Sequence, residues 1–213
     1  AEAVDYKHEV TISPASQWGE PEETLTYTVL IKNKGEQDDT YSLGLVSNVP
    51  TGWQIYILPS SITISDDSEA SVTLYVAVGD RSDAAGGKTE QFTAYCNSTG
   101  SSNNHTVSGS TTVHKVFGTS LSTDTSQIAV DPNNAASFSI TVLNDKGNDD
   151  DTITFSQSST GTDSWSFALP GSETIAPDAS KVVTFSVTPD LEAIAGLKSI
   201  SFIATSSEET CQP

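Results

Sequence analysis

The chain has 213 residues, of which 35% are hydrophobic, and its 28 acidic residues against 9 basic ones give a formal net charge of −19. This balance makes nucleic acid and anionic membrane surfaces poor partners, because each phosphate contact requires a Lys or Arg that the chain mostly lacks. No apolar run approaches the roughly 18 residues that a membrane-spanning helix needs, so the sequence predicts no membrane insertion.

The first half of the chain predicts short β-strands separated by turns rich in Gly, Pro, Asn and Asp. Apolar and polar residues alternate, as in strands with one buried face, over residues 10–12, 25–31, 39–45, 53–57, 61–64, 72–78 and 90–95. Residues 98–110 are rich in Ser, Asn and Gly and predict a flexible excursion. Residues 111–117 predict a terminal strand or the connector between domains.

A variant of this first half returns later in the chain. Asn33-Lys-Gly35 corresponds to Asn144-Asp-Lys-Gly147, which has one additional residue in the turn. The same register continues in the pairs Asp39/Asp151, Trp53/Trp165, Tyr27/Phe138, Val29/Ile140, Ile64/Ile175, Val72/Val183, Leu74/Phe185, Phe92/Phe202 and Ala94/Ala204. A repeat of this length predicts two copies of one domain, because solenoid repeats have periods of roughly 20–50 residues. We place the first domain at residues 1–113, with an N-terminal arm, and the second at residues 114–213.

These observations predict an all-β chain of two tandem immunoglobulin-like antiparallel β-sandwiches. Each half carries about seven short strands and lacks a helical period of useful length. The turn at Asn33-Lys-Gly35 is expected to use Asn and Gly for their tolerance of positive φ. Trp53 and Trp165 each open a strand at the same place in the repeat, so we expect both in the core.

The order of these motifs resembles the immunoglobulin-like modules of the NEW3 and CARDB type. The resemblance rests on Asn33-x-Gly35, Asp39-Thr-Tyr41, Gly52-Trp53, Leu58-Pro59 and Phe92-x-Ala94 and covers nearly all of both halves. The second half departs from it at Ser164, which replaces the Gly before Trp165, and in its longer turn. Such modules recur in archaeal and bacterial surface proteins and beside glycoside hydrolases, which implies an extracellular, non-catalytic role.

Acidic residues gather in the two repeated turns. Asp38 and Asp39, and Asp149, Asp150 and Asp151, place hard oxygen ligands where turn carbonyls would complete a calcium shell. Neither turn matches the twelve-residue EF-hand pattern. The alternative is structural, because an Asp carboxylate in a turn accepts hydrogen bonds from backbone amides. We favour this structural role and expect no cofactor, with calcium as the one alternative.

Several features predict a secreted protein at a cell surface. Ala1-Glu-Ala-Val4 has the form of a mature end left by signal-peptide removal, which an expression boundary would also produce. Asn97 and Asn104 begin two glycosylation sequons. Cys96 and Cys211 predict a disulfide, either within the chain or to another subunit, with two free thiols as the alternative.

The residues that usually carry catalysis lie in no catalytic motif. His8, His105 and His114 lie in neither a Gly-x-Ser-x-Gly nor a His-Glu-x-x-His context. We therefore expect no enzyme.

Two functions remain. The first is a non-catalytic structural subunit or segment of an extracellular assembly, such as a filament, pilus or surface layer, with copies of itself or other surface proteins as partners. In this interpretation the N-terminal arm, with Val4, Tyr6 and Val10, donates a strand to a neighbour's sheet. The second is a carbohydrate-binding or adhesive accessory module, in which Trp18, Tyr56 and Tyr75 stack on glycans. Ordinary exposed strand residues are the simpler interpretation of these aromatics.

Overall fold

The computed structural model describes residues 5–46, 48–162 and 164–206, and it divides into unit 1 (Ala1–Lys115) and unit 2 (Val116–Pro213). The division falls two residues beyond the boundary expected from the sequence. In the described ranges every regular element is a strand, which confirms the all-β class. No described helix is long and apolar enough to cross a membrane.

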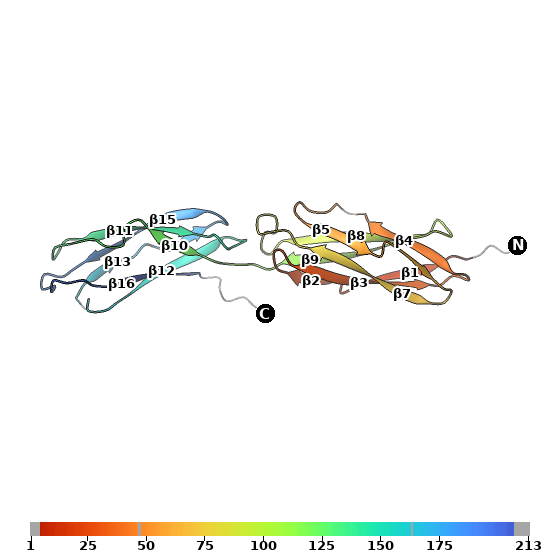
Figure 1. The fold of residues 1–213 in the computed structure, drawn as a ribbon, viewed down its shortest axis with the longest axis horizontal. Coiled ribbons are helices and arrows are strands. Elements are labelled where there is room, and N and C mark those ends of the chain that lie inside the picture. The colour runs from red at the N-terminus through yellow and green to blue at the C-terminus, as the bar shows by residue number, and fades with distance from the viewer. Residues whose placement is uncertain (1–4, 47, 163, 207–213) are drawn as a thin grey trace. The chain divides into compact units, whose positions relative to one another are not determined.

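Unit 1 contains two sheets (Figure 1). The strands are β1 (His8–Ser13), β2 (Ser16–Gly19), β3 (Thr24–Asn33), β4 (Asp39–Leu45), β5 (Gln54–Leu58), β6 (Ser61–Ile64), β7 (Glu69–Ala77), β8 (Thr89–Ser98) and β9 (Asn104–Val113). One sheet has the order β1-β3-β7-β5, and the other has the order β2-β9-β8-β4-β6. The described strand pairs of unit 1 are antiparallel except β2 with β9, which run parallel.

Unit 2 repeats this plan with fewer described strands (Figure 1). They are β10 (Ser120–Thr123), β11 (Ala136–Leu143), β12 (Asp151–Ser159), β13 (Ser166–Ala168), β14 (Glu173–Ile175), β15 (Ser180–Thr188) and β16 (Ile200–Ser206). The orders are β10-β11-β15-β13 and β14-β12-β16. The first sheet corresponds strand for strand to β1-β3-β7-β5, while no described strand of the second sheet takes the positions of β9 and β2.

The cores form because alternate strand residues face inward between the two sheets. In β3, Tyr27, Val29 and Ile31 are buried, and their neighbours along the strand are more exposed. Residues that correspond in the repeat also have corresponding partners across these strands. Val29 lies opposite Val72, and Ile140 lies opposite Val183. Trp53 is buried, whereas Trp165 is only half-buried.

The Ser/Asn-rich segment is not a flexible excursion. Residues 99–103 form the turn of a hairpin in which β8 and β9 pair antiparallel over the whole of each strand. The sequence did not predict β9 because some of its inward-facing residues are small or polar, so the usual alternation of apolar and polar residues is absent. Gly109 is buried, and a Cβ at this position would lie 2.6 Å from the ring of Phe92. The ring therefore occupies the space that a side chain on Gly109 would fill.

The turn after β3 is held by a buried side-chain amide and not by positive φ. Asn33 is 1% exposed; its Nδ2 donates to the carbonyls of Gln37 (2.8 Å) and Ile64 (3.0 Å), and its Oδ1 accepts from the Gly35 amide (2.9 Å). Neither Asn33 nor Gly35 has a positive φ, so the reason given above for this turn was wrong. Unit 2 repeats all three bonds from Asn144, with Asp149, Ile175 and Gly147 as partners at 3.0, 3.0 and 3.1 Å.

We expect Asn33→Ala to destabilise unit 1 and Asn144→Ala to destabilise unit 2, each by about 1–3 kcal/mol, because each change leaves one buried and one part-buried carbonyl without its donor. Differential scanning calorimetry of the two variants measures the loss. The control is Asn134→Ala, at an exposed turn position. Losses no larger than that of the control would contradict the role assigned to the amides.

Candidate functional site

The buried carboxylates of the two acidic turns accept hydrogen bonds from donors within the same chain. Asp39 is 4% exposed, and its Oδ1 accepts from the amide of Gly100 (3.1 Å). Asp151 is fully buried and accepts from the hydroxyls of Thr119 (3.2 Å) and Ser206 (2.6 Å). Both carboxylates are therefore structural acceptors at the start of a strand.

The remaining carboxylates of these turns are exposed or half-buried. Asp38 accepts from the Asp66 amide at 3.3 Å, and Asp149 accepts from the Asp150 amide at 2.9 Å. Within the described ranges, no three His, Cys, Asp or Glu side chains gather in a way that would hold a metal ion. Calcium at these turns stays a prediction.

A buried polar cluster that the sequence did not predict lies around His8. The His8 ring is 3% exposed, and its Nε2 donates to the carbonyl oxygen of Cys96 at 3.1 Å. The rings of His105 and Tyr41 lie 4.4 and 4.9 Å from it. Burial lowers the pKa of His8, and the His105 ring adds to this effect. Burial, with a contribution from Asp39, raises the pKa of Tyr41 to about 12. At neutral pH both side chains are therefore uncharged, and the buried Tyr41 hydroxyl has no hydrogen-bond partner among the described residues.

Cys96 lies in the same cluster and is a free thiol. It is 0% exposed, and burial followed by the charge of Asp39 raises its pKa to about 12. His8 bonds the backbone of Cys96 and not its sulfur. The buried, unpaired Cys96 packs in the core of unit 1, which agrees with the alternative of free thiols. The disulfide with Cys211 or with another subunit stays a prediction. Cys211 lies outside the described residues.

The N-terminal arm is used inside unit 1. β1 pairs antiparallel with β3, and Val10 lies opposite Ile31. The carbonyls of Asp5 and Lys7 accept from the amides of Glu36 (3.1 Å) and Lys34 (2.8 Å). From Tyr6 to Val10 the arm is therefore not free to be donated, contrary to the prediction, because its backbone already has partners.

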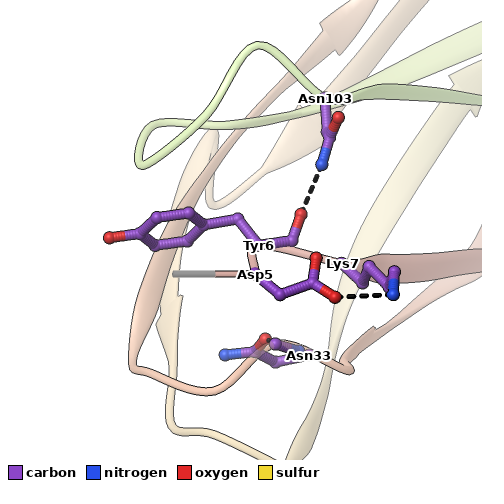
Figure 2. A network of polar contacts seen from close by, with 6 residues as sticks. Asp5, Tyr6, Lys7, Asn33 and Asn103 are labelled. Atoms are coloured by element: carbon purple, nitrogen blue, oxygen red, sulfur yellow. Dashed lines mark hydrogen bonds and ion pairs between the residues drawn. The ribbon is translucent and has the colours of Figure 1, made fainter. Parts of the chain in front are cut away.

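Figure 2 shows the arm between the turn that carries Asn33 and the hairpin that carries Asn103. The Asn103 amide donates to the Tyr6 carbonyl, and the Tyr6 ring lies against Gly100, where it takes the space that a Cβ would need. Lys7 forms an ion pair with Asp5 (Figure 2). Val4 lies outside the described residues.

The two sequon asparagines face each other across the β8–β9 hairpin, where Asn97 is the partner of Asn104. Asn104 is exposed at the first residue of β9, whereas Asn97 is half-buried. Asn104 is thus the more accessible acceptor. Glycosylation at both positions stays a prediction.

The three candidate aromatics do not form one platform. Trp18 is 57% exposed on β2, with its ring 5.1 Å from that of His114. Tyr56 and Tyr75 are cross-strand partners on β5 and β7, in the other sheet, and their rings stack at 5.0 Å. A face of each tyrosine ring is covered by the other ring.

The site that the structure adds is the outer edge of β16. In unit 1, β8 lies between β4 and β9, so both of its edges are paired. In the described part of unit 2, β16 pairs only with β12. By their pairing with β12, Phe202 and Ala204 take the places that Ala94 and Cys96 have in unit 1. Ala94 and Cys96 are 1% and 0% exposed, whereas Phe202 and Ala204 are only partly buried.

A substitution on the facing sheet matches this difference. In unit 1 the Tyr27 hydroxyl donates to the carbonyl of Ser110 (2.8 Å) and shares a hydrogen bond with the Thr111 hydroxyl (2.7 Å), both on β9. Its repeat counterpart is Phe138, which has no hydroxyl to offer such a strand.

β16 also has few of the features that protect an edge strand. Its sequence, Ile200-Ser-Phe-Ile-Ala-Thr-Ser206, has no charge and no proline, and Ile203 is 39% exposed. Among the described edge strands it is the longest; β13 and β14 have three residues each, and β1 carries Glu9. Long uncharged edges are ready templates for pairing with another strand.

Comparison with known proteins gives the fold alone. No family model and no curated protein matches the chain. Among solved structures, a protein of unknown function from Porphyromonas gingivalis W83 is 15% identical over 84% of this chain and 83% of that one, with a TM-score of 0.36. The YadV chaperone is 12% identical over 92% of both chains, with a TM-score of 0.34. The BIgI domain of the beta protein from S. agalactiae, bound to CEACAM1, is 14% identical over 51% of this chain and 97% of that one, with a TM-score of 0.33.

We expect the Cys96 thiol of a Cys211→Ser chain to resist aromatic disulfide reagents at pH 8, because a buried thiol with a raised pKa offers almost no thiolate. The full reaction should appear on addition of denaturant. A thiol assay before and after unfolding gives both values. Rapid reaction of the folded chain would place Cys96 at an accessible surface and contradict its burial.

Proposed function

We propose that the chain is a non-catalytic structural segment of an extracellular cell-surface assembly, a filament, pilus or surface layer, that is held together by protein–protein contacts. The observation that carries the proposal is the outer edge of β16, which pairs with no other strand among the described residues of unit 2. An edge of this kind binds a partner through main-chain hydrogen bonds, and pockets for alternate side chains supply specificity.

The charge distribution supports contact at this edge. The net charge of −19 keeps such chains apart over most of their surface, whereas β16 carries no charge. The acidic composition, the two sequons and the resemblance to NEW3 and CARDB modules support an extracellular location. The partners in this proposal are copies of the chain or other surface proteins.

A second candidate function is glycan binding by an adhesive accessory module. The stacked, half-exposed pair of Tyr56 and Tyr75 and the exposed Trp18 favour it. Their separation on two sheets weakens it, since a sugar chain is held best by aromatics that share one surface. Retention on insoluble polysaccharides that is lost in Trp18→Ala or Tyr56→Ala would support this candidate against the first.

The assembly proposal is tested on intact cells of the source organism with an antibody against the chain and a membrane-impermeant cross-linker. We expect surface labelling and cross-linked species of higher mass. Ile203→Lys, which puts a charge on β16, should remove these species, whereas Leu121→Lys, at a similarly exposed position on the edge strand β10, should leave them. A chain found only inside cells, or one that never cross-links, would refute the proposal.

A further inference from the structure

The loop between β15 and β16 exposes three large aliphatic side chains. The loop lies at the end of unit 2 opposite the turn that carries Asn144. Leu191, Ile194 and Leu197 are 68%, 81% and 82% exposed. Single apolar residues scattered over a surface are ordinary. Three on one short loop, with polar residues around them, are typical of an interaction site.

The corresponding loop of unit 1 shows that the fold does not require these side chains. Gly79 and Pro189 stand at equivalent points, because each carbonyl accepts at 3.0 Å from an amide in the turn before β3 or β11. From these points the two loops have the same length, over residues 79–88 and 189–198. The three aliphatic residues therefore correspond to a charged residue, a buried small residue and a glycine. The pairs are Leu191/Arg81, Ile194/Ala84 and Leu197/Gly87.

In unit 1 this loop closes over the core, whereas in unit 2 it projects into solvent. Ala84 is buried, and the carbonyl of Asp83 accepts from Nε1 of the buried Trp53 at 3.5 Å. In unit 2 the counterpart Trp165 is only half-buried, and a Cβ on Gly196 would meet no atom within 4 Å beyond its chain neighbours. Unit 2 thus exposes apolar surface that unit 1 avoids, and its folding gains nothing from that exposure.

The charges around the exposed aliphatic residues are mainly negative. Asp190 and Glu192 flank Leu191, and Asp131 lies in the adjoining turn, which is hydrogen-bonded to the start of the loop. Lys198 is the one cation among the described residues of the loop and this turn. A complementary surface therefore has an apolar centre to receive the aliphatic side chains and Lys or Arg at its rim.

We propose that Leu191, Ile194 and Leu197 insert into an apolar pocket of a different protein, whose rim carries Lys or Arg. The contact goes beyond the function proposed above, because it uses the side chains of a loop and not the backbone edge of β16. A second copy of the chain is disfavoured as the occupant, since each copy has a net charge of −19. An anionic membrane is disfavoured for the same reason.

The test uses a triple variant of the full chain, Leu191→Ser, Ile194→Ser, Leu197→Ser, which removes the apolar surface and keeps the charge. We expect the variant to unfold at the temperature of the parent chain, because the three side chains are exposed. The matched control is Val182→Ser, which removes a side chain of 64% exposure from β15. Calorimetry of both variants checks that they are folded before binding is measured.

Photo-cross-linking identifies the partner. An Ile194→Cys, Cys211→Ser chain is labelled with a benzophenone maleimide, and a Val182→Cys, Cys211→Ser chain is labelled in the same way as the control. Cys96 is buried and is not labelled in the folded chain. Each chain is irradiated with proteins extracted from the source organism without denaturant, and the adducts are mapped by mass spectrometry.

We expect an adduct that only the label at position 194 forms, at an apolar segment of the partner with Lys or Arg beside it. Adducts common to both label positions, the absence of an adduct specific to position 194, or an adduct at a site without this chemistry would overturn the proposal.

Isothermal titration of the purified partner with the full chain then tests the contact itself. The triple variant should weaken binding about tenfold or more, and Val182→Ser should leave it unchanged. Asp190→Asn with Glu192→Gln should weaken binding about threefold and reduce its dependence on salt, because the rim charges are screened. An affinity that the triple variant leaves unchanged would contradict insertion of the aliphatic side chains.

Two further measurements test the other occupants. The parent chain should not float with vesicles of zwitterionic phosphatidylcholine and should scatter light as a monomer. Vesicle binding or dimer formation that the triple variant abolishes would assign the loop to a lipid surface or to a second copy, and either result overturns the proposal. Its failure leaves the assembly proposal and the edge of β16 unaffected.

Discussion

The buried amide of Asn33, repeated by Asn144, is the interaction on which both units depend. Each amide joins the end of one strand to the turn that follows it and to a carbonyl at the end of β6 or β14, in the other sheet. The side chain thereby satisfies backbone groups that no strand can reach at this corner of the sandwich. With the corner fixed, Asp39 and Asp151 enter the next strand as buried acceptors, and the pairings of β3 with β7 and of β4 with β6 recur in the same register as β11 with β15 and β12 with β14.

On this common frame the two units differ in how far the second sheet is completed. In unit 1 the chain turns back after β8 and adds β9, so that the β8 edge is paired and the core is closed by Tyr27 and Phe92. In unit 2 the described sheet ends at β16, and a cluster of phenylalanines stands in place of the hydroxyl contacts. An uncharged strand with one free edge is a hazard in a purely structural spacer. It is a usable surface in a segment that binds a neighbour.

Strand alternation and the repeat were sufficient to predict the fold. Tyr27, Val29 and Val72 face the core as predicted, because a single buried face imposes a period of two. β9 escaped prediction because Gly109 and Thr111 lie in its buried phase, and their burial depends on the Phe92 ring and the Tyr27 hydroxyl, which are distant in sequence. The burial of Cys96 was open to prediction, since it shares the inward phase of Phe92 and Ala94 on β8, but the even cysteine count favoured a disulfide. The His8 cluster could not be predicted because it forms only when β1 pairs with β3 and brings His8 against Tyr41 and the Cys96 carbonyl, which are distant in sequence.

The central claim is that the described part of unit 2 has the frame of unit 1 with the outer edge of β16 unpaired, and amide hydrogen exchange of the isolated chain tests it most directly. The account predicts slow exchange along all of β8, whose amides bond to β4 or β9. In β16 slow and fast amides should alternate, because only those that face β12 have partners. Uniformly slow exchange along β16, equal to that of β8, would show that the edge is already covered and would contradict the account.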